Sequence, residues 1–240
     1  RHLPETKLVS SSRDVLEFLK KHRTCFYKPI NGTGGRNILK IEQLSPTLFQ
    51  IEGRSDQRKI IPVQKVTAAE LKRRMIKWKN DTKREYIVQQ GIDIRLKNGR
   101  VHDYRLLIQK NEIGEWEVTG CAARIGPPRS VTSNLHGGGK AVKMESVLKH
   151  RFPTHEKQEE IKSRLHQFAH HVVEDLEKKY NPMIELALDI ALDRNGHPWL
   201  LEINPKPARE VFAKIGDEET YRSAVTRPLQ YALWKYSNSK

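Results

Sequence analysis

The alternation of apolar and polar side chains is clearest near the end of the chain, where it predicts a β-hairpin. A run from Ile184 to Asp193 alternates with a two-residue period, and a second run follows from Trp199 to Asn204. This period is that of a strand. Asn195-Gly196 between the runs favours a two-residue hairpin loop, because both residue types tolerate positive φ. Such a loop pairs Arg194 with His197 and sets Asp189 directly opposite Glu202.

The opposed carboxylates of this hairpin indicate a cation. Two ionised side chains at directly paired positions repel each other, and carboxylate and amide oxygens suit Mg²⁺ or Mn²⁺. The candidate ligands are Asp189, Glu202 and Asn204. The alternative is a surface hairpin whose acidic residues face water, and a three-residue loop would shift the register. The two-residue period predicts that Leu200, Glu202 and Asn204 lie on one face of the second strand, and that Trp199, Leu201 and Ile203 lie on the other.

Periodicity elsewhere predicts helices that alternate with antiparallel strands, which is an α+β arrangement. The predicted helices are Ser12 to His22, Ala68 to Trp78, Glu156 to Lys179 and Glu218 to Tyr236. The predicted strands are Thr24 to Lys28, Asn37 to Ile41, Leu48 to Glu52, Tyr86 to Gln90, Val101 to Gln109 and Trp116 to Arg124.

A glycine-rich segment follows the first long strand. Lys28 ends that strand, and the small residues Asn31, Gly32, Thr33, Gly34 and Gly35 come directly afterwards. Backbone N–H groups of such residues can approach an anion closely, while the lysine adds a point charge. The spacing matches neither the Walker motif nor the dinucleotide fingerprint. A hairpin turn that merely uses glycines explains the segment equally well.

Two arginines on neighbouring predicted strands form a third group. Arg105 and Arg124 could converge on phosphate or carboxylate oxygens in a bidentate manner, and a structural pair between Arg105 and Asp103 is the alternative. A loop rich in Gly, Pro and Ser then runs from Gly126 to Lys140, longer than ordinary connections. Loops of this kind often close over a site. The polar residues of interest in it are Asn134 and His136.

Composition narrows the partners. The formal net charge of +15 favours anionic ones, and a nucleic-acid role rests on this charge alone, because no aromatic RNA-binding signature accompanies it. No apolar run reaches the roughly 20 residues of a membrane span. The first residues lack a signal-peptide core, so the sequence predicts a cytoplasmic protein. Cys25 and Cys121 are expected to be buried free thiols. His166 and His170 have metal-binding spacing but no evident third ligand.

Taken in order, the motifs KPINGTGG, YIVQQGI, DYRLLI, SNLHGGG and the hairpin Asp with Glu-Ile-Asn resemble the ATP-grasp superfamily. Within it, they are most similar to the YheC/YheD-like group, described as endospore coat-associated. The resemblance implies two α+β lobes with antiparallel sheets that enclose a nucleotide site: residues 1–90 with the glycine-rich phosphate loop, and residues 91–240 with the metal-binding hairpin. It also implies a ligase that activates a carboxylate as an acyl phosphate, which an amine or other nucleophile then attacks.

The same resemblance implies a role for each candidate residue. Lys28 would hold the phosphates of ATP, and Asn31, Gly32, Thr33, Gly34 and Gly35 would form a mobile loop above them. Gln89, Gln90, Gly91 and Ile92 would form the hinge that recognises adenine, with Leu200 as a further nucleotide contact. Asp189, Glu202 and Asn204 would bind Mg²⁺ or Mn²⁺. Arg105 and Arg124 would stabilise the transferring phosphoryl group, and Asn134 and His136 would line the acceptor side.

Two alternatives to a ligase stay open at this point. ATP-grasp proteins usually have an N-terminal α/β domain before the segment where this chain begins, which leaves room for a non-catalytic nucleotide-binding structural protein of the spore coat. The other alternative is a nucleic-acid-binding module driven by positive charge. The sequence identifies neither the carboxylate nor the nucleophile. The basic composition favours a peptide or an acidic polymer as acceptor.

Overall fold

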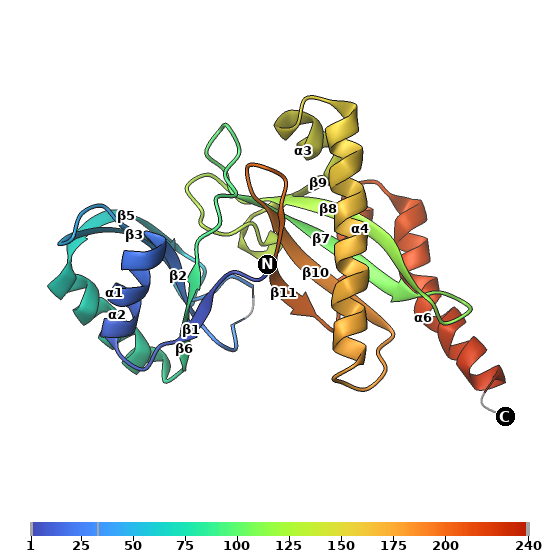
Figure 1. Ribbon diagram of the computed structural model, residues 1–240, viewed down its shortest axis with the longest axis horizontal. Helices are drawn as coiled ribbons and strands as arrows, with labels where there is room; N and C mark the ends of the chain where they lie inside the picture. Colours follow the sequence, from blue (N-terminus) through green and yellow to red (C-terminus); the bar gives the residue numbers. More distant parts are fainter. Residues whose placement is uncertain (1, 33, 239–240) are drawn as a thin grey trace. The chain divides into compact units, whose positions relative to one another are not determined.

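The computed structural model describes residues 2–32 and 34–238, and within them the strands form two antiparallel sheets flanked by helices (Figure 1). The chain divides into two compact units. The glycine-loop unit contains Pro4–Val101 and Gly126–Gly139. The hairpin unit contains the start of the chain, His102–Ile125 and the chain from Lys140 onward. The predicted lobes of 1–90 and 91–240 stay a prediction, and the two units are described separately.

The glycine-loop unit is built on a six-stranded sheet with the order β1-β6-β2-β3-β4-β5. Its elements are β1 (Thr6–Leu8), α1 (Ser12–His22), β2 (Thr24–Pro29), β3 (Ile38–Gln43), β4 (Leu48–Arg54), β5 (Ile60–Thr67), α2 (Ala68–Thr82), β6 (Tyr86–Gln90) and the short 3-10 helix η1 (Leu135–Gly137). In Figure 1, α1 and α2 lie together against this sheet.

The sequence of this unit explains why one face of the sheet is buried. Val15, Phe18 and Leu19 form the apolar stripe of α1, with the three-to-four-residue spacing of a helix face. Cys25 and Tyr27 of β2 alternate with less buried neighbours and pack into the same core. The alternate residues of the strands therefore point to the opposite face, away from the core helices.

The hairpin unit is built on a five-stranded sheet with the order β11-β10-β7-β8-β9. Its elements are β7 (His102–Lys110), β8 (Trp116–Ile125), β9 (Lys140–Lys143), α3 (Met144–Arg151), α4 (His155–Glu177), β10 (Glu185–Leu192), β11 (Pro198–Asn204), α5 (Glu210–Lys214) and α6 (Glu218–Ser237). Figure 1 shows α4 crossing one face of this sheet. On the other face, α6 contacts β7, where the Gln109 side chain donates to the carbonyl of Ala224.

The loop of the β10–β11 hairpin differs from the prediction. The N–H of Asp193 donates to the carbonyl of His197, so the loop has three residues, and the expected Arg194–His197 pair is wrong. Gly196 supplies the positive φ, +79°, that such a loop requires. The register then shifts between Asp189 and Ile190, which places one extra residue in β11. As a result Asp189 still lies opposite Glu202, and that part of the prediction is confirmed.

The same bulge changes which side chains share a face. Leu200 pairs with Ile190, whereas Glu202 pairs with Asp189, the next residue along β10. Adjacent residues of β10 point to opposite faces, so the expected common face of Leu200 and Glu202 is wrong. Leu200 instead lines a cavity of about 900 Å³ together with Phe168 and Leu176 of α4.

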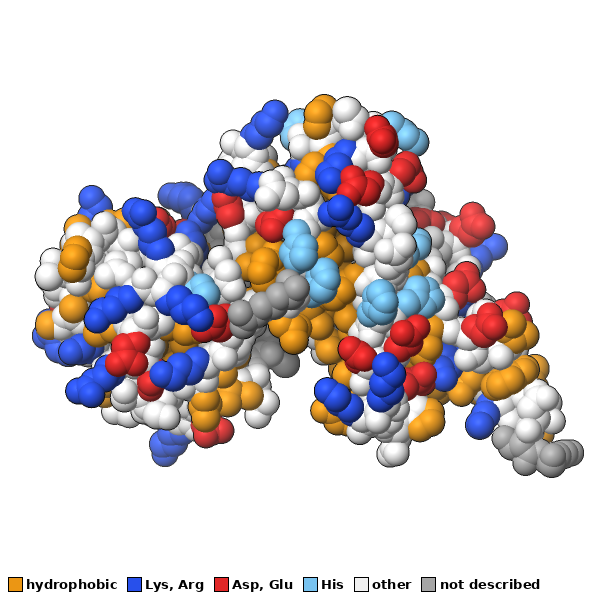
Figure 2. All heavy atoms as spheres, in the orientation of Figure 1, with side chains coloured by type: hydrophobic (Ala, Val, Ile, Leu, Met, Phe, Trp, Pro, Cys, Tyr) orange, Lys and Arg blue, Asp and Glu red, His pale blue; other side chains and the backbone are white. Residues whose placement is uncertain are grey.

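Two expectations from composition have structural counterparts. None of the helices in the described parts of the chain combines the length and apolar character needed to cross a bilayer. Cys25 and Cys121 are both free, Cys25 buried and Cys121 half-buried as a residue. Burial raises the pKa of each thiol above its usual range, which makes them poor nucleophiles. On the face drawn in Figure 2, Lys and Arg side chains are spread over both units.

Replacing Gly196 with alanine tests the hairpin loop. A Cβ atom at Gly196 would lie 2.8 Å from Cδ1 of Ile161, in a backbone conformation that alanine disfavours. We expect left-handed strain of about 1–2 kcal/mol plus about 1–3 kcal/mol from overpacking, measured as the free energy of unfolding in denaturant. Gly216→Ala in the same unit is the control, because its φ is +72° with no atom within 4 Å of the added Cβ. Equal losses in the two variants would contradict the predicted clash.

Candidate functional site

The face of the glycine-loop sheet that points away from α1 and α2 carries two of the predicted site residues, Lys28 and Gln89, together with further polar side chains. Phe26 pairs with both Gln89 and Lys40, and Lys40 pairs with Glu52, so these four residues form one row across the strands. Lys28 follows two residues after Phe26, and Arg54 two residues after Glu52. Because side chains alternate along a strand, Lys28 and Arg54 belong to this same face, at its glycine-loop end.

Lys28 is held in place by a predicted hinge residue. Its Nζ donates to Oε1 of Gln89 at 2.8 Å, and Nε2 of Gln89 donates to Oγ1 of Thr6. The structure therefore brings together two of the predicted nucleotide contacts. Gln90 is bound through its backbone and side chain to Glu5, and the N–H of Gly91 donates to the carbonyl of Thr24.

The predicted phosphate loop contacts the Gly126–Gly139 segment. Gly34 and Gly35 both have positive φ, +63° and +71°. A Cβ at Gly35 would lie 2.8 Å from Oδ1 of Asn134, so only glycine permits this approach. Asn31 is exposed, Gly32 is half-buried, and Thr33 lies outside the described residues. His136, in η1, is exposed, so Asn134 is the acceptor-side candidate that the structure places against the loop.

A cavity of about 290 Å³ lies within the glycine-loop unit beside the predicted hinge. Gly91 and Ile92 line it, and Phe26 contributes an aromatic wall. Its other lining residues include Thr24, Lys40, Glu42, Arg95, Val101 and Val131. Polar side chains line this hollow as much as apolar ones do, and an aromatic wall surrounded by polar groups suits a flat heteroaromatic ring.

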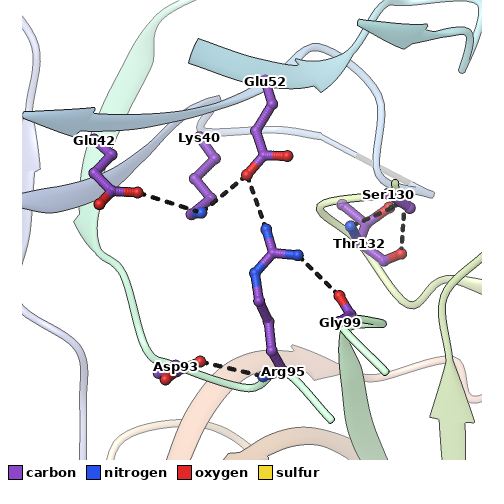
Figure 3. A network of polar contacts seen from close by, with 8 residues as sticks. All are labelled: Lys40, Glu42, Glu52, Asp93, Arg95, Gly99, Ser130 and Thr132. Carbon is purple, nitrogen blue, oxygen red and sulfur yellow. Dashed lines mark hydrogen bonds and ion pairs between the residues drawn. The ribbon is translucent and has the colours of Figure 1, made fainter. Parts of the chain in front are cut away.

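The charges at this cavity are balanced by a network that the sequence did not reveal. Figure 3 shows Lys40 and Arg95 both directed at the nearly buried carboxylate of Glu52. The distances from Oε1 of Glu52 are 2.9 Å to Lys40 Nζ and 2.8 Å to Arg95 Nη2. Glu42 lies 4.0 Å from the same lysine. Alternation could have placed Lys40 and Glu52 on one face, but Arg95 comes from an irregular segment without a periodic signal.

The hairpin unit places both predicted arginines on Asp189. Arg105 donates from Nε to Oδ1 and from Nη2 to Oδ2 of Asp189, each at 2.9 Å, which is the bidentate fork geometry. Arg124 approaches the same Oδ2 at 2.8 Å. The expected convergence of the two guanidiniums is therefore present, but its centre is a carboxylate of the protein.

Arg124 also binds a second carboxylate, so the network closes with equal charges. Its Nε and Nη2 donate to the two oxygens of Asp103 at 2.7 and 2.6 Å. Arg124 and Asp189 are each 2% exposed, so the ions are paired where water is scarce. The expected pair between Arg105 and Asp103 is replaced by Arg105 with Asp189 and Arg124 with Asp103.

The protonation of Asp189 follows from these contacts. Burial alone would raise the pKa of this carboxyl, but the charges and hydrogen bonds of Arg124 and Arg105 outweigh burial and hold the pKa below its usual value. Burial likewise opposes the charge on Arg124, and Asp103 and Asp189 nevertheless raise the pKa of Arg124. Asp189 is therefore an anion at neutral pH.

The three predicted metal ligands differ in their surroundings. Glu202 is exposed and lies opposite Asp189 in the strand register. Nδ2 of Asn204 is buried without a hydrogen-bond partner, and a half-turn of the amide would put an oxygen ligand there. A carboxylate has about four lone-pair positions, and the arginines use three of them on Asp189. The donor set thus fits a hard divalent cation. The described residues include no cluster of three or more His, Cys, Asp or Glu suited to a metal.

Comparisons with known proteins identify a family and two curated relatives. The family model described as YheC/D like ATP-grasp matches residues 1–234. The endospore coat-associated protein YheC of Bacillus subtilis (strain 168) is 30% identical over 239 residues, which cover 98% of this chain and 63% of that protein. YheD of the same organism is 27% identical, over 97% of this chain and 50% of that protein. The chain thus spans about half to two thirds of the length of these relatives.

Solved structures share the fold at low sequence identity. D-cycloserine synthetase DcsG matches 97% of this chain and 65% of its own, with a TM-score of 0.52 and 14% identity. The ADP complex of the N5-carboxyaminoimidazole ribonucleotide synthetase purK matches 86% of this chain and 41% of its own, with a TM-score of 0.51 and 12% identity. These likenesses show the fold, and the predicted α+β ATP-grasp arrangement is confirmed.

Replacing Asp189 with asparagine tests the charge network. The variant keeps the side-chain shape but leaves two guanidiniums with one carboxylate, so a buried charge becomes uncompensated. We expect the free energy of unfolding to fall by about 3–5 kcal/mol. Glu202→Gln is the control, because an exposed substitution of this kind changes stability by no more than about 0.5 kcal/mol. Similar losses in both variants would contradict the central position of Asp189.

The lowered pKa of Asp189 also predicts a pH dependence. A carboxyl whose folded pKa lies below its unfolded value, about 3.9, stabilises the fold above that value. The contribution is lost as the pH falls through the folded pKa. We therefore expect the difference in unfolding free energy between the wild type and Asp189→Asn to shrink below about pH 4. A difference that stays constant from pH 6 to pH 3 would contradict the assignment.

Proposed function

Because this chain belongs to the YheC/D-like ATP-grasp family, we propose that it is an ATP- and Mg²⁺-dependent ligase that joins a carboxylate to an amine or another nucleophile. The ATP-grasp fold generally implies the use of ATP and a divalent metal. The observation that carries the finer proposal is the β10–β11 register, in which a bulge keeps Asp189 opposite Glu202 although the loop has three residues. A hairpin under no such constraint would need no compensating bulge.

We assign the nucleotide contacts to the glycine-loop unit. The cavity beside Gly91 and Ile92 would take the adenine, with Phe26 against the ring. Lys28, oriented by Gln89, would contact the phosphates, and the loop around Gly34 and Gly35 would cover them. Backbone N–H groups and a lysine are a recurrent combination for binding phosphate. Leu200 is not among these contacts, because it packs against α4.

We assign the metal to the hairpin unit. Glu202, Asn204 and the one remaining lone pair of Asp189 would hold Mg²⁺, which when bound offsets the negative charge of the phosphates. Arg105 and Arg124 keep Asp189 ionised and fix its orientation. Their own charges are matched by Asp189 and Asp103, so their part in this proposal is to position a metal ligand.

The chemistry that this arrangement would serve has two steps. An oxygen of the substrate carboxylate attacks the terminal phosphorus of ATP, the bond from that phosphorus to the bridging oxygen breaks, and ADP leaves. The nucleophile then attacks the acyl carbon, releases inorganic phosphate and gives up one proton. Electrostatic stabilisation and positioning are sufficient for such transfers, so no serine or cysteine nucleophile is needed. This agrees with the unreactive buried thiols.

A structural protein of the spore coat is the second candidate, because the relative that matches at 30% identity is named as coat-associated. Such a protein would bind the nucleotide and release no ADP. The acceptor of a ligase is unidentified, and the net charge of +15 favours an acidic peptide or polymer. ADP release on addition of acidic peptides separates the two candidates. A product mass equal to peptide plus nucleophile minus water would identify the ligase.

Calorimetric titration with a non-hydrolysable ATP analogue tests the proposed site. We expect the wild type to bind the analogue more tightly with Mg²⁺ than without it. Glu202→Ala should lose at least about tenfold of the Mg²⁺-dependent gain, equivalent to about 1.4 kcal/mol, because a metal ligand is removed. ATP turnover in this variant should be abolished without unfolding.

The matched control is Glu112→Ala, which removes an exposed carboxylate from the β7–β8 turn of the same unit. It should leave both the affinity and its Mg²⁺ dependence unchanged. Binding that is equally tight with and without Mg²⁺ in the wild type and in Glu202→Ala would remove the metal assignment. Binding that depends on salt and not on the nucleotide would favour a polyanion-binding protein.

A further inference from the structure

A group of arginines in the glycine-loop unit forms no ion pair with a carboxylate of the described residues. Arg54, at the end of β4, is 2% exposed. Its Nε donates to Oγ of Ser130 at 3.2 Å and its Nη2 to the carbonyl of Gly137 at 2.7 Å, and both acceptors are neutral. A buried cation that meets only neutral acceptors is unusual, because the cost of removing the charge from water is repaid mainly by an anion.

Arg58 adds a second charge at the same place. A Cβ at Gly34 would lie 2.7 Å from Nη2 of Arg58, so this guanidinium packs directly on the predicted phosphate loop. Arg58 has a positive φ of 59°, which is uncommon for a side chain of this size. Its Nε is buried without a hydrogen-bond partner. Nε of Arg58 is thus a buried hydrogen-bond donor beside the loop that has no acceptor.

The two charges repel each other. Burial lowers the pKa of Arg54, and the nearby charge of Arg58 lowers it further. Arg36, the residue directly after the glycines, also has a buried Nε without a partner. Across residues 2–32 and 34–238, no carboxylate lies within 4 Å of a nitrogen of Arg36, Arg54 or Arg58. Three positive groups therefore lie at this end of the loop without an ion pair, and the nearby carboxylate of Asp56 accepts a hydrogen bond from Asn37 instead.

The hairpin unit shows the opposite arrangement. Arg105 and Arg124 are matched one for one by Asp189 and Asp103. An anion that approaches that quartet meets no net positive charge from it. Uncompensated positive charge is therefore the property that distinguishes the arginines of the glycine-loop unit from the pair that the motifs single out.

We propose that Arg58 and Arg36, with Arg54 as a positioning residue, form the site for the terminal phosphate of the bound nucleotide. The assignment rests on the proposed function. It assigns the contact with the terminal phosphate to arginines beside the glycine loop, whereas the resemblance implied Arg105 and Arg124. Lys28 and Arg54 share one face at the same end of the sheet. A phosphate chain that passes Lys28 toward the glycines reaches the arginines with its last group, which carries the greatest negative charge.

Arg54 acts through its neighbours. Its bonds to Ser130 and Gly137 fix the Gly126–Gly139 segment, and a Cβ at Gly137 would lie 2.2 Å from Nη1 of Arg54. That segment also carries Asn134, which contacts Gly35. Arg54 therefore holds the two loops in register and adds a long-range positive charge, while Arg58 and Arg36 supply donors for direct contact.

The test compares nucleotides that differ only in the terminal phosphate. The affinities of a non-hydrolysable ATP analogue and of ADP are measured in Mg²⁺ by calorimetry for the wild type, for Arg58→Gln and for Arg36→Gln with Arg58→Gln. We expect the double variant to bind the ATP analogue about tenfold or more weakly and to bind ADP within about twofold of the wild type, because charged hydrogen bonds to one phosphate are lost. Glutamine at position 58 keeps the left-handed strain comparable.

Arg73→Gln is the control matched in charge to Arg58→Gln, since it removes one exposed arginine from α2 on the helix-covered side of the sheet. It should change neither affinity. Equal weakening of ADP and the analogue in the double variant, or no weakening of either, overturns the arginine assignment while leaving the proposed function intact. Failure of the wild type to bind any of the nucleotides overturns the proposed function and this assignment together.

Discussion

The pairing of buried ions on the hairpin sheet is the interaction on which the remaining features of that unit depend. Asp189 lies at the centre of a continuous apolar strand, where an isolated carboxylate would be protonated. Two guanidiniums keep it ionised, one from β7, which pairs with β10, and one from β8, the next strand beyond β7. Because the fork geometry needs each arginine at a defined register position, the order β10-β7-β8 and the ionic network specify each other.

The sequence predicted the parts of this design that follow from local periodicity. The bounds of α1 and β6 are confirmed, and the hairpin was recognised from alternation and the Asn195-Gly196 pair. The loop length was wrong, because Asn195-Gly196 also suits a three-residue loop with glycine in the left-handed region. The bulge that restores the register leaves no periodic signal, and for this reason the face of Leu200 was assigned incorrectly.

Some strands and helices were not predicted because their sequences also lack a periodic signal. β5 contains Pro62, and β1 and α5 have only three and five residues, too short for a period to show. The pairing of each arginine was also beyond the sequence, because alternation gives the face of a residue and not the strand that lies beside it. Asp103 and Arg105 share a face, yet their partners are Arg124 and Asp189. Counting the charges on this face would not have shown which ones touch.

The path of the chain has a consequence for how such proteins can be rearranged. The chain passes from the glycine-loop unit into the hairpin unit after Val101, returns at Gly126 and leaves again after Gly139. The fourteen residues from Gly126 to Gly139 are therefore an insertion of one unit's sequence inside the other. Neither unit is a contiguous stretch of sequence, so no recombination event with a single breakpoint can exchange one of them intact. We expect the two units to be inherited together, and new specificities to arise by substitution within them.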